Sequence, residues 1–224
     1  MTLKSVYKQN QTFFLGYFFL LIIAIILLVI DTKKAAFLLL NPYHSDFLNY
    51  FFIGVTFIGD GFFSIIICIV ALLFKKRFLS FMIFVSFATS GIFAQVLKAF
   101  IREGRPAMFL KNSNYPYFID HVTLHNFHSF PSGHTTSAFA LVAILAFALK
   151  NKKYAIPLVA LGALVGYSRI YLGQHFLLDV TVGSFVGVIF SFFCWIVFQK
   201  YFNKIEPVLP NGEKPIVLKD EMKT

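Results

Sequence analysis

The chain has 224 residues, of which 58% are hydrophobic, 13% are charged and 31 are phenylalanines. A soluble domain of this size cannot bury so much apolar surface, so the composition excludes an ordinary globular protein and predicts an all-α integral membrane protein. The formal net charge of +10 does not indicate nucleic-acid binding, because the basic residues form short clusters between apolar runs.

Six apolar segments predict a bundle of six transmembrane helices. In chain order they are Phe13–Ile30, Tyr50–Phe74, Phe78–Ile101, Thr135–Leu149, Tyr154–Tyr171 and Phe176–Phe198. The first is longer than the apolar core of a signal peptide and lacks a cleavage motif after it, so we expect an uncleaved span. The fourth is short, and we expect its helix to begin earlier, near Pro131.

The basic residues divide unequally between the two ends of such a bundle. Thirteen of the twenty fall on the side of both termini: Lys4, Lys8, Lys75, Lys76, Arg77, Lys150, Lys152, Lys153, Lys200, Lys204, Lys214, Lys219 and Lys223. The other seven are Lys33, Lys34, Lys98, Arg102, Arg105, Lys111 and Arg169. The positive-inside rule therefore predicts cytoplasmic termini in the inner (cytoplasmic) membrane, with the opposite face toward the periplasm or exterior.

Residues 1–202 are expected to form one six-span domain. Residues 203–224 contain three prolines and mixed charge, which predicts a mobile cytoplasmic tail. Glycine pairs four residues apart in the last two spans predict close helix packing: Gly162 with Gly166 and Gly183 with Gly187. Cys68 and Cys194 lie in apolar runs, so we expect neither a structural disulfide nor a cysteine zinc site.

The first polar group is "KAFIREGRP", Lys98 to Pro106. If the third helix continues to Arg105, then Lys98, Arg102 and Arg105 lie on one helix face. Three cations on one stripe repel one another unless an anion lies among them. The alternative is that these long side chains only reach lipid head groups at the membrane surface.

Two further groups contain histidine. Pro131-Ser132-Gly133 precedes a helix, where free backbone N–H groups and a hydroxyl favour an anion, and His134 lies in the first turn. His175 and Asp179 are four residues apart, so the carboxylate is expected to hold one imidazole nitrogen and leave the other free as a nucleophile. Arg169 adds a planar set of donors suited to phosphate.

Together these residues resemble the three-part signature of the type 2 phosphatidic acid phosphatase superfamily. The matching positions occur in order over residues 98–179, with gaps of 24 and 33 residues: Lys98, Arg105, Pro106; Pro131, Ser132, Gly133, His134; Ser168, Arg169, His175, Asp179. The resemblance implies that His175 attacks phosphorus to form a phosphohistidine and that Asp179 orients it. It also implies that His134 protonates the leaving oxygen and later activates water.

The resemblance further implies that the phosphoryl oxygens are bound by Lys98, Arg105, Ser132, Gly133 and Arg169, with no metal ion or other cofactor. The implied substrates are lipid phosphates: phosphatidate, phosphatidylglycerol phosphate, undecaprenyl diphosphate or lipid A. No nucleic acid and no obligate protein partner are expected. Phosphotransfer to another acceptor uses the same intermediate and stays open. An anion transporter or channel is a further alternative, but it leaves the His175–Asp179 pair without a purpose.

Other polar residues have weaker claims. His121, His125 and His128 suggest a metal cluster, but no matching carboxylate or cysteine set accompanies them, so loop packing or head-group contact is the preferred interpretation. Arg102 lies outside the signature and is expected to contact a second phosphate, a lipid head group or only the membrane surface. Asp60, between two glycines in the second span, is expected to support either the active-site side or a helix–helix contact and not to be catalytic.

Overall fold

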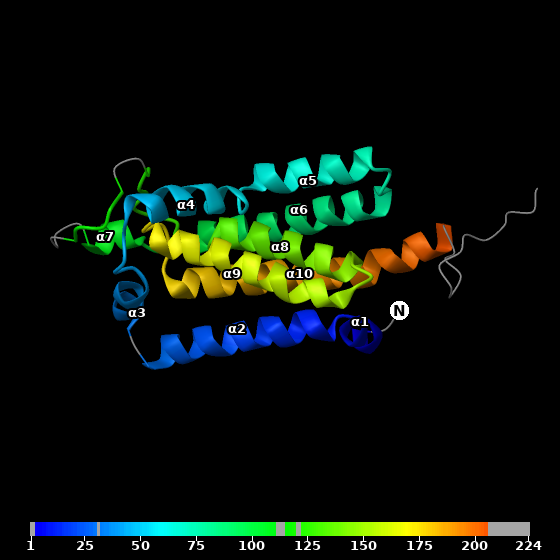
Figure 1. The fold of residues 1–224 in the computed structure, drawn as a ribbon, viewed down its shortest axis with the longest axis horizontal. Helices are drawn as coiled ribbons and strands as arrows, with labels where there is room; N and C mark the ends of the chain where they lie inside the picture. The colour runs from blue at the N-terminus through cyan, green and yellow to red at the C-terminus, as the bar shows by residue number, and fades with distance from the viewer. Residues whose placement is uncertain (1–2, 31, 111–114, 120–121, 206–224) are drawn as a thin grey trace, which may run out of the picture.

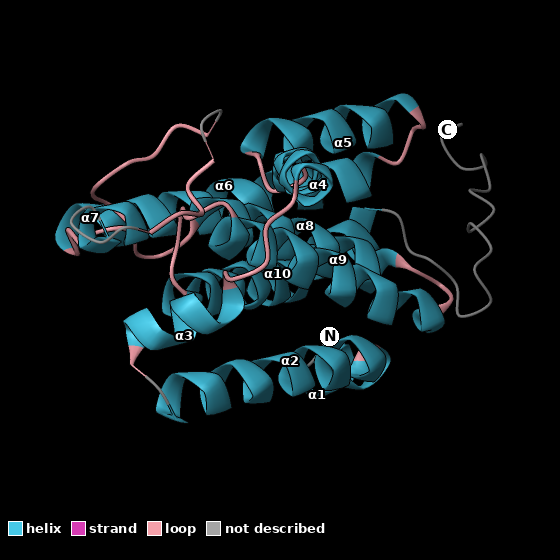
Figure 2. Ribbon diagram, turned by 60° about the vertical axis from the view of Figure 1, so that its left-hand side comes forward, coloured by secondary structure: helices cyan, strands magenta, loops and turns pink. Residues whose placement is uncertain are grey.

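The computed structural model describes residues 3–30, 32–110, 115–119 and 122–205, and this part of the chain is helical, without strands (Figure 2). Its helices are α1 (Leu3–Gln9), α2 (Gln11–Ile30), α3 (Lys33–Leu40), α4 (Asp46–Phe57), α5 (Gly61–Leu73), α6 (Arg77–Phe100), α7 (Pro106–Leu110), α8 (Gly133–Ala148), the 3₁₀ helix η1 (Lys152–Tyr154), α9 (Ala155–Tyr171) and α10 (Leu177–Ile205). The all-α prediction is confirmed for the described residues.

Helix α8 forms the centre of the bundle, and α6, α9 and α10 pack around it (Figure 1). Twelve of its sixteen residues are buried. Helix α5 packs on α6, and α2 packs on α9. The short helices α3 and α7 lie together at one end of the bundle, away from α1 (Figure 1). An apolar helix buried on all sides is the expected core of such a bundle.

Glycines allow α9 and α10 to approach α8 closely. A Cβ atom on Gly183 would lie 2.6 Å from the Ser132 carbonyl oxygen, and one on Gly187 would lie 2.5 Å from the Thr136 carbonyl oxygen. On α9, a Cβ on Gly162 would lie 3.1 Å from the Phe139 ring. The predicted close packing is therefore confirmed, since larger residues at these positions would push the helices apart.

The expectation of six full-length spans is only partly met. Within the described residues, four helices are long and apolar enough to cross a membrane: α2, α6, the η1–α9 segment and α10. A fifth span exists if α4 and α5, which meet at a bend of 56°, count as one. The fourth predicted segment corresponds to α8, which begins earlier as expected but has only 16 residues, fewer than the roughly 20 needed for a full crossing.

The predicted second span is broken at Gly59-Asp60-Gly61. The Asp60 side chain accepts a hydrogen bond from Phe62 N (2.9 Å) and so caps α5. Gly59 packs against α8, where a Cβ atom would lie 2.8 Å from the His134 carbonyl oxygen. Asp60 thus lies at the bend between α4 and α5, beside the first turn of α8, and starts α5 as its N-cap.

The third predicted span, Phe78–Ile101, matches α6 closely. Since α6 ends at Phe100 and does not continue to Arg105, the condition for Lys98, Arg102 and Arg105 to share one helix face is not met. Beyond α6 the backbone pairs with the loop before α8: Arg105 N donates to Asn126 O (2.8 Å) and Ser129 N donates to Glu103 O (3.0 Å). Gly104 and Pro106 also oppose helix continuation. Arg102 is therefore exposed in a loop, while Arg105 turns inward and is 9% exposed.

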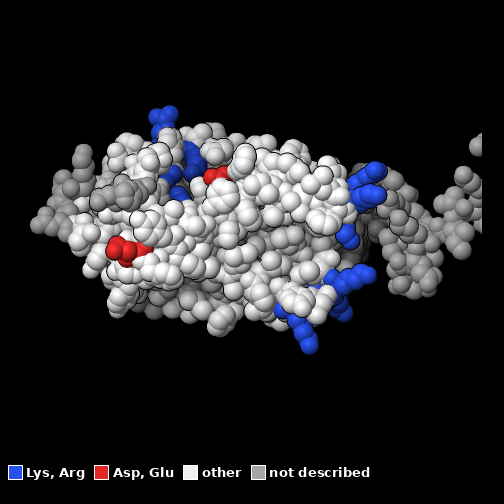
Figure 3. Space-filling view, turned by 45° about the horizontal axis from the view of Figure 1, so that its top comes forward, with Lys and Arg blue, Asp and Glu red and all other residues white. Residues whose placement is uncertain are grey.

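One end of the bundle carries most of the described basic residues. The turns α5–α6 and α8–α9 lie there, together with α1 and the C-terminal end of α10 (Figure 1). On the face drawn in Figure 3, basic side chains gather at this end, and a wide uncharged band separates them from basic atoms sunk in a hollow near the other end. At this end, Lys152 joins the α1–α2 junction to the end of α8, because its Nζ donates to Asn10 Oδ1 (2.8 Å) and Phe147 O (3.0 Å).

The expected tail from residue 203 stays a prediction. Helix α10 runs to Ile205, and residues 206–224 lie outside the described part of the chain.

Candidate active site

A cavity of about 1080 Å³ lies at the end of the bundle opposite α1. Its walls come from α4, the α4–α5 break, α6, α8, α9 and the loop before α8. Six of the residues predicted for the site line it: Lys98, Arg105, Gly133, His134, Arg169 and His175. Predicted site residues separated by up to 77 positions in the sequence thus meet around one space.

His175 lies in the turn between α9 and α10, and Asp179 lies in the first turn of α10. The Nδ1 atom of His175 is 3.4 Å from Asp179 Oδ2, so the expected contact is present although His175 precedes α10. The Asp179 side chain is fully buried, and its Oδ2 also accepts a hydrogen bond from Phe176 N (2.9 Å). With Nδ1 directed at the carboxylate, Nε2 is the free nitrogen of the imidazole.

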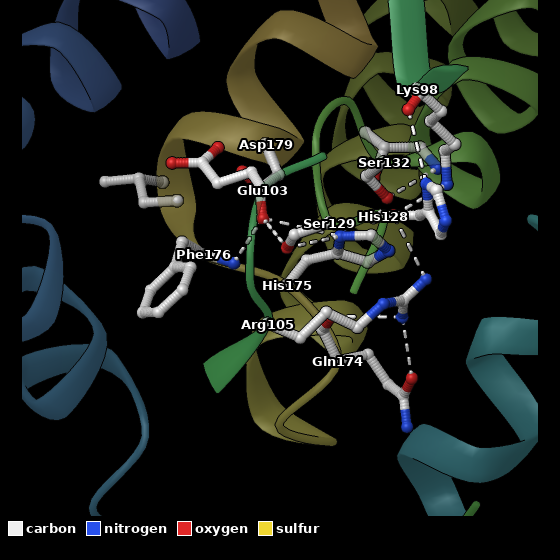
Figure 4. Close-up of polar contacts among 12 residues, drawn as sticks. Lys98, Glu103, Arg105, His128, Ser129, Ser132, Gln174, His175, Phe176 and Asp179 are labelled. Atoms are coloured by element: carbon white, nitrogen blue, oxygen red, sulfur yellow. Dashed lines mark hydrogen bonds and ion pairs between the residues drawn. The ribbon is translucent and has the colours of Figure 1, made fainter. Parts of the chain in front are cut away.

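Burial keeps the free imidazole neutral. His175 is 1% exposed, and this burial lowers its pKa from 6.5 to about 3. The hydrogen bond with Asp179 raises the pKa, but burial has the larger effect. In Figure 4 the ring lies between Asp179 on one side and Lys98 and Arg105 on the other. A neutral imidazole with one nitrogen held is a competent nucleophile at neutral pH.

Ser129 joins the histidine and the aspartate. It is fully buried in the loop before α8; its hydroxyl donates a short hydrogen bond to Asp179 Oδ2 and lies 3.5 Å from His175 Nδ1 (Figure 4). The carboxylate oxygen that contacts the histidine is thus fixed by a second side chain. Sequence reasoning missed Ser129, and its position two residues before Pro131 was the only available signal.

Arg105 is held in place by neighbouring oxygens. Its Nε donates to Phe127 O (3.0 Å), and one terminal nitrogen donates to Gln174 O (3.2 Å) and Gln174 Oε1 (3.0 Å). Gln174 is itself fixed, because its side-chain amide donates to Thr123 O (2.8 Å). These contacts position the guanidinium before any anion binds. Gln174 was also missed, although it directly precedes His175.

Lys98 reaches the same region from the end of α6. Its Nζ donates to His128 O (3.3 Å), and His128 Nδ1 lies 3.2 Å from Lys98 O. A Cβ atom on Gly133 would lie 4.0 Å from Lys98 Nζ and meet no other heavy atom of the described chain within that distance, so the start of α8 faces the ammonium across open space. The N–H groups of Gly133 and His134 belong to the first turn, which has no helical acceptors for them. A helix N-terminus beside a cation favours an anion between the two.

Arg169 approaches from the end of α9 and is 7% exposed. One of its terminal nitrogens donates to Thr56 Oγ1 (2.6 Å), a contact with α4 that the sequence did not predict. Its Nε is buried and has no hydrogen-bond partner among the residues that the structure describes. A buried guanidinium donor without an acceptor is costly, and a bound anion would relieve that cost.

The remaining candidates lie at or beyond the edge of the cavity. Ser132 is buried behind it as the N-cap of α8 and accepts a hydrogen bond from Thr135 Oγ1 (2.9 Å). His125 lines the cavity, whereas Arg102 is exposed and does not line it within the described chain. His121 lies outside the described residues. Among the residues described, no three His, Cys, Asp or Glu side chains gather as metal ligands.

Comparison with known proteins identifies the family. The chain is 37% identical over 106 residues to a lipid A 4′-phosphatase of Porphyromonas gingivalis, covering 45% of this chain and only 42% of that protein. It is 28% identical to phosphatidylglycerophosphatase B of Bacillus subtilis, over 71% of this chain and 77% of that protein.

A crystal structure of a transmembrane PAP2-type phosphatidylglycerolphosphate phosphatase from Bacillus subtilis has the same fold. It superposes with a TM-score of 0.61 at 25% identity, over 87% of this chain and 97% of that chain. The sequence profile of the PAP2 superfamily matches residues 78–203, which is more than half of the chain and contains all of the predicted site residues. The protein therefore belongs to the PAP2 superfamily of membrane phosphatases.

Proposed function

We propose that the protein hydrolyses a phosphate monoester, or the terminal phosphate of a diphosphate, on a membrane lipid through a phosphohistidine at His175. The observation that carries this proposal is the meeting of the His175–Asp179 pair, His134 and three cations around one cavity. Each feature alone has an ordinary structural explanation. Their convergence is the arrangement that phosphoryl transfer requires.

The reaction has two steps. In the first, His175 Nε2 attacks phosphorus while Asp179 holds the proton on Nδ1; the bond to the lipid oxygen breaks, and His134 donates a proton to that oxygen. The charge of bound phosphate favours the protonated form of His134. In the second, neutral His134 takes a proton from water as the water attacks phosphorus, and the phosphorus–nitrogen bond breaks to release phosphate.

Lys98, Arg105 and Arg169 would hold the phosphoryl oxygens and stabilise the charge that spreads over them in the transition state. The buried Nε of Arg169, which has no hydrogen-bond partner among the described residues, and the N–H groups in the first turn of α8 supply donors that an anion would satisfy. Three cations supply the electrostatic stabilisation that a metal ion supplies in other phosphatases. We therefore propose a metal-independent reaction.

The cavity also suits a lipid. Beyond the cations it continues along α6 between apolar side chains: Ile53, Phe87, Ala88, Ile92 and Val96. Ile92 and Val96 are 66% and 46% exposed, so this apolar arm opens at the side of the bundle where acyl or prenyl chains would lie. A substrate would then keep its tail in the bilayer and place its phosphate among the cations. Phosphatidate, phosphatidylglycerol phosphate, undecaprenyl diphosphate and lipid A all meet this description.

The test is phosphate release by the detergent-purified protein from these four lipids, with and without excess chelator. We expect chelator-resistant release that His175→Ala and Asp179→Asn abolish and that Arg102→Ala, at an exposed position outside the cavity, retains. Alkaline quenching with a ³²P-labelled substrate is expected to trap an alkali-stable phosphoprotein in wild type and in Arg102→Ala but not in His175→Ala. Release that persists in His175→Ala would exclude this nucleophile, and phosphate recovered on an added alcohol or sugar would indicate phosphotransfer.

A further inference from the structure

A lysine outside the family signature lies directly behind the nucleophile. Lys33 is the first residue of α3, and its Nζ lies 2.5 Å from Glu103 Oε1 and 3.7 Å from Asp179 Oδ1. The same ammonium lies 4.4 Å from the centroid of the Phe176 ring. Lys33 thus contacts the carboxylate that orients His175, from the side opposite the imidazole.

We propose that Lys33 is a positioning residue of the reaction, which acts through Asp179 by keeping its carboxylate ionised and directed at His175. This inference rests on the proposed function, because it assigns a role within that chemistry. Lys33 does not line the cavity within the described chain, so it is not expected to touch the substrate.

The two oxygens of Asp179 have different surroundings. Oδ2 contacts Ser129 Oγ, Phe176 N and His175 Nδ1. Oδ1 is buried and makes no hydrogen bond with the described residues; the nearby ammonium of Lys33 is its ion-pair partner. A fully buried carboxylate that loses its cation takes up a proton more readily, because burial disfavours its charge.

Glu103 is a second carboxylate that competes with Asp179 for Lys33. It lies in the loop after α6, and in the view of Figure 4 it is on the side of Asp179 away from Lys98 and Arg105. The ammonium of Lys33 on α3 therefore contacts the carboxylates of both Glu103 and Asp179. The other charged or titratable groups that act on Asp179 are His175 from the α9–α10 turn and, across the site, Lys98 and Arg105. Without Lys33, Glu103 would become an uncompensated anion beside Asp179.

The ionised state of Asp179 matters most when the phosphohistidine forms. The imidazole then carries positive charge, and only an ionised carboxylate at Nδ1 stabilises it. A protonated Asp179 would slow this step without weakening phosphate binding. Loss of Lys33 is therefore expected to lower kcat, to leave KM nearly unchanged and to act most strongly at low pH.

The test compares Lys33→Met, Lys33→Arg, Glu103→Gln and the Lys33→Met/Glu103→Gln double variant, with Lys34→Met as the matched control. Lys34 is the neighbouring lysine and is exposed. For each folded variant, kcat and KM for the best lipid are measured from pH 3 to 9. We expect Lys33→Met to move the acid limb of kcat up by about one pH unit, which is about a tenfold loss at a pH below both limbs.

Lys33→Arg and Lys34→Met should retain the wild-type profile. Glu103→Gln removes the competing carboxylate, so its acid limb should stay at or below the wild-type position, and the double variant should fall between the two single ones. If Lys33 serves only to hold α3 against the loop through its ion pair with Glu103, Lys33→Met and Glu103→Gln would both lose that ion pair. Their kcat values would then fall by the same factor at every pH, which would overturn the inference.

If Lys33→Met does not fold, Glu103→Gln alone decides, because a loss of kcat at low pH in that variant contradicts the proposed balance. The proposed function is judged separately. Active wild type with inactive Asp179→Asn supports that function, and an unchanged Lys33→Met profile in the same experiment would then refute only the role of Lys33.

Discussion

At the scale of single residues, the site depends on groups whose ionisation differs from that in water. The pKa of His175 is lowered to about 3 by burial, whereas the same side chain in the unfolded chain titrates near 6.5. Below pH 6.5 the unfolded chain binds a proton that the folded protein does not. This histidine therefore favours folding fully above pH 6.5, and its contribution is lost as the pH falls toward 3.

This difference predicts an acid-sensitive stability. One pH unit below 6.5, the linkage from His175 amounts to about 1.4 kcal/mol of unfolding free energy. His175→Gln, which cannot titrate, should lose less stability than wild type between pH 7.5 and 5.5 in the same detergent. Thermal unfolding followed by intrinsic fluorescence measures this, and equal losses in the two proteins would show that His175 is not held neutral by the fold.

Ser129 is the second residue whose role can be measured. Its hydroxyl fixes the Asp179 oxygen that contacts His175, so Ser129→Ala should lower kcat about tenfold and leave KM within about twofold. Ser64→Ala is the matched control: its hydroxyl is buried in α5 and has no hydrogen-bond partner in the described part of the chain. An unchanged kcat in Ser129→Ala would show that Asp179 needs no support from this side.

At the scale of elements, the sequence predicts the helices better than their ends. Hydropathy located the cores of the long helices, because lipid-facing and core-facing residues are both apolar. It did not predict the 56° break between α4 and α5, since Asp60 within an apolar run looks like an isolated polar residue until its capping contact is seen. The end of α6 was predicted to within one residue, but the pairing of Glu103 and Arg105 with the distant loop was not, because it is a tertiary effect.

Helix α6 forms one wall of the apolar arm, and Gly91 gives a way to close it. Gly91 lines the cavity, and a Cβ atom there would meet nothing within 4 Å, so a larger side chain would enter the arm without a clash at its first carbon. Gly91→Phe should raise KM for a long-chain lipid phosphate about tenfold and leave hydrolysis of a short, water-soluble phosphate ester nearly unchanged.

Gly54 on α4 provides the matched substitution. A Cβ atom there also meets nothing within 4 Å, but Gly54 does not line the cavity within the described chain. Gly54→Phe should therefore keep the wild-type KM for both substrates. Equal effects of Gly91→Phe on the long and the short substrate would mean that the tail does not follow α6.

At the scale of the whole molecule, the bundle brings the three signature segments together at one end. The residue types and their order were enough to predict Lys98, Arg105, Gly133, His134, Arg169 and His175 as one group, and all six line the cavity. The supporting contacts from Thr56, Gln174 and Lys33 were not predictable, because they join distant segments whose packing the sequence pattern does not specify. The signature describes the groups expected to act on phosphate, and the fold supplies the residues that hold them.

The orientation of the bundle in the membrane is the last property that the arrangement predicts. The α5–α6 turn, with Lys75, Lys76 and Arg77, lies at the end of the bundle that holds α1, whereas the loop with Arg102 lies at the end of the cavity. The positive-inside rule assigns the first end to the cytoplasm and thus the cavity to the periplasm or exterior. In a background with Cys68 and Cys194 replaced by alanine, Arg102→Cys should react with a membrane-impermeant maleimide in intact cells. Lys76→Cys should react only after the cells are permeabilised. The reverse pattern would place the phosphate site in the cytoplasm and would require the enzyme to draw its lipid from the inner leaflet.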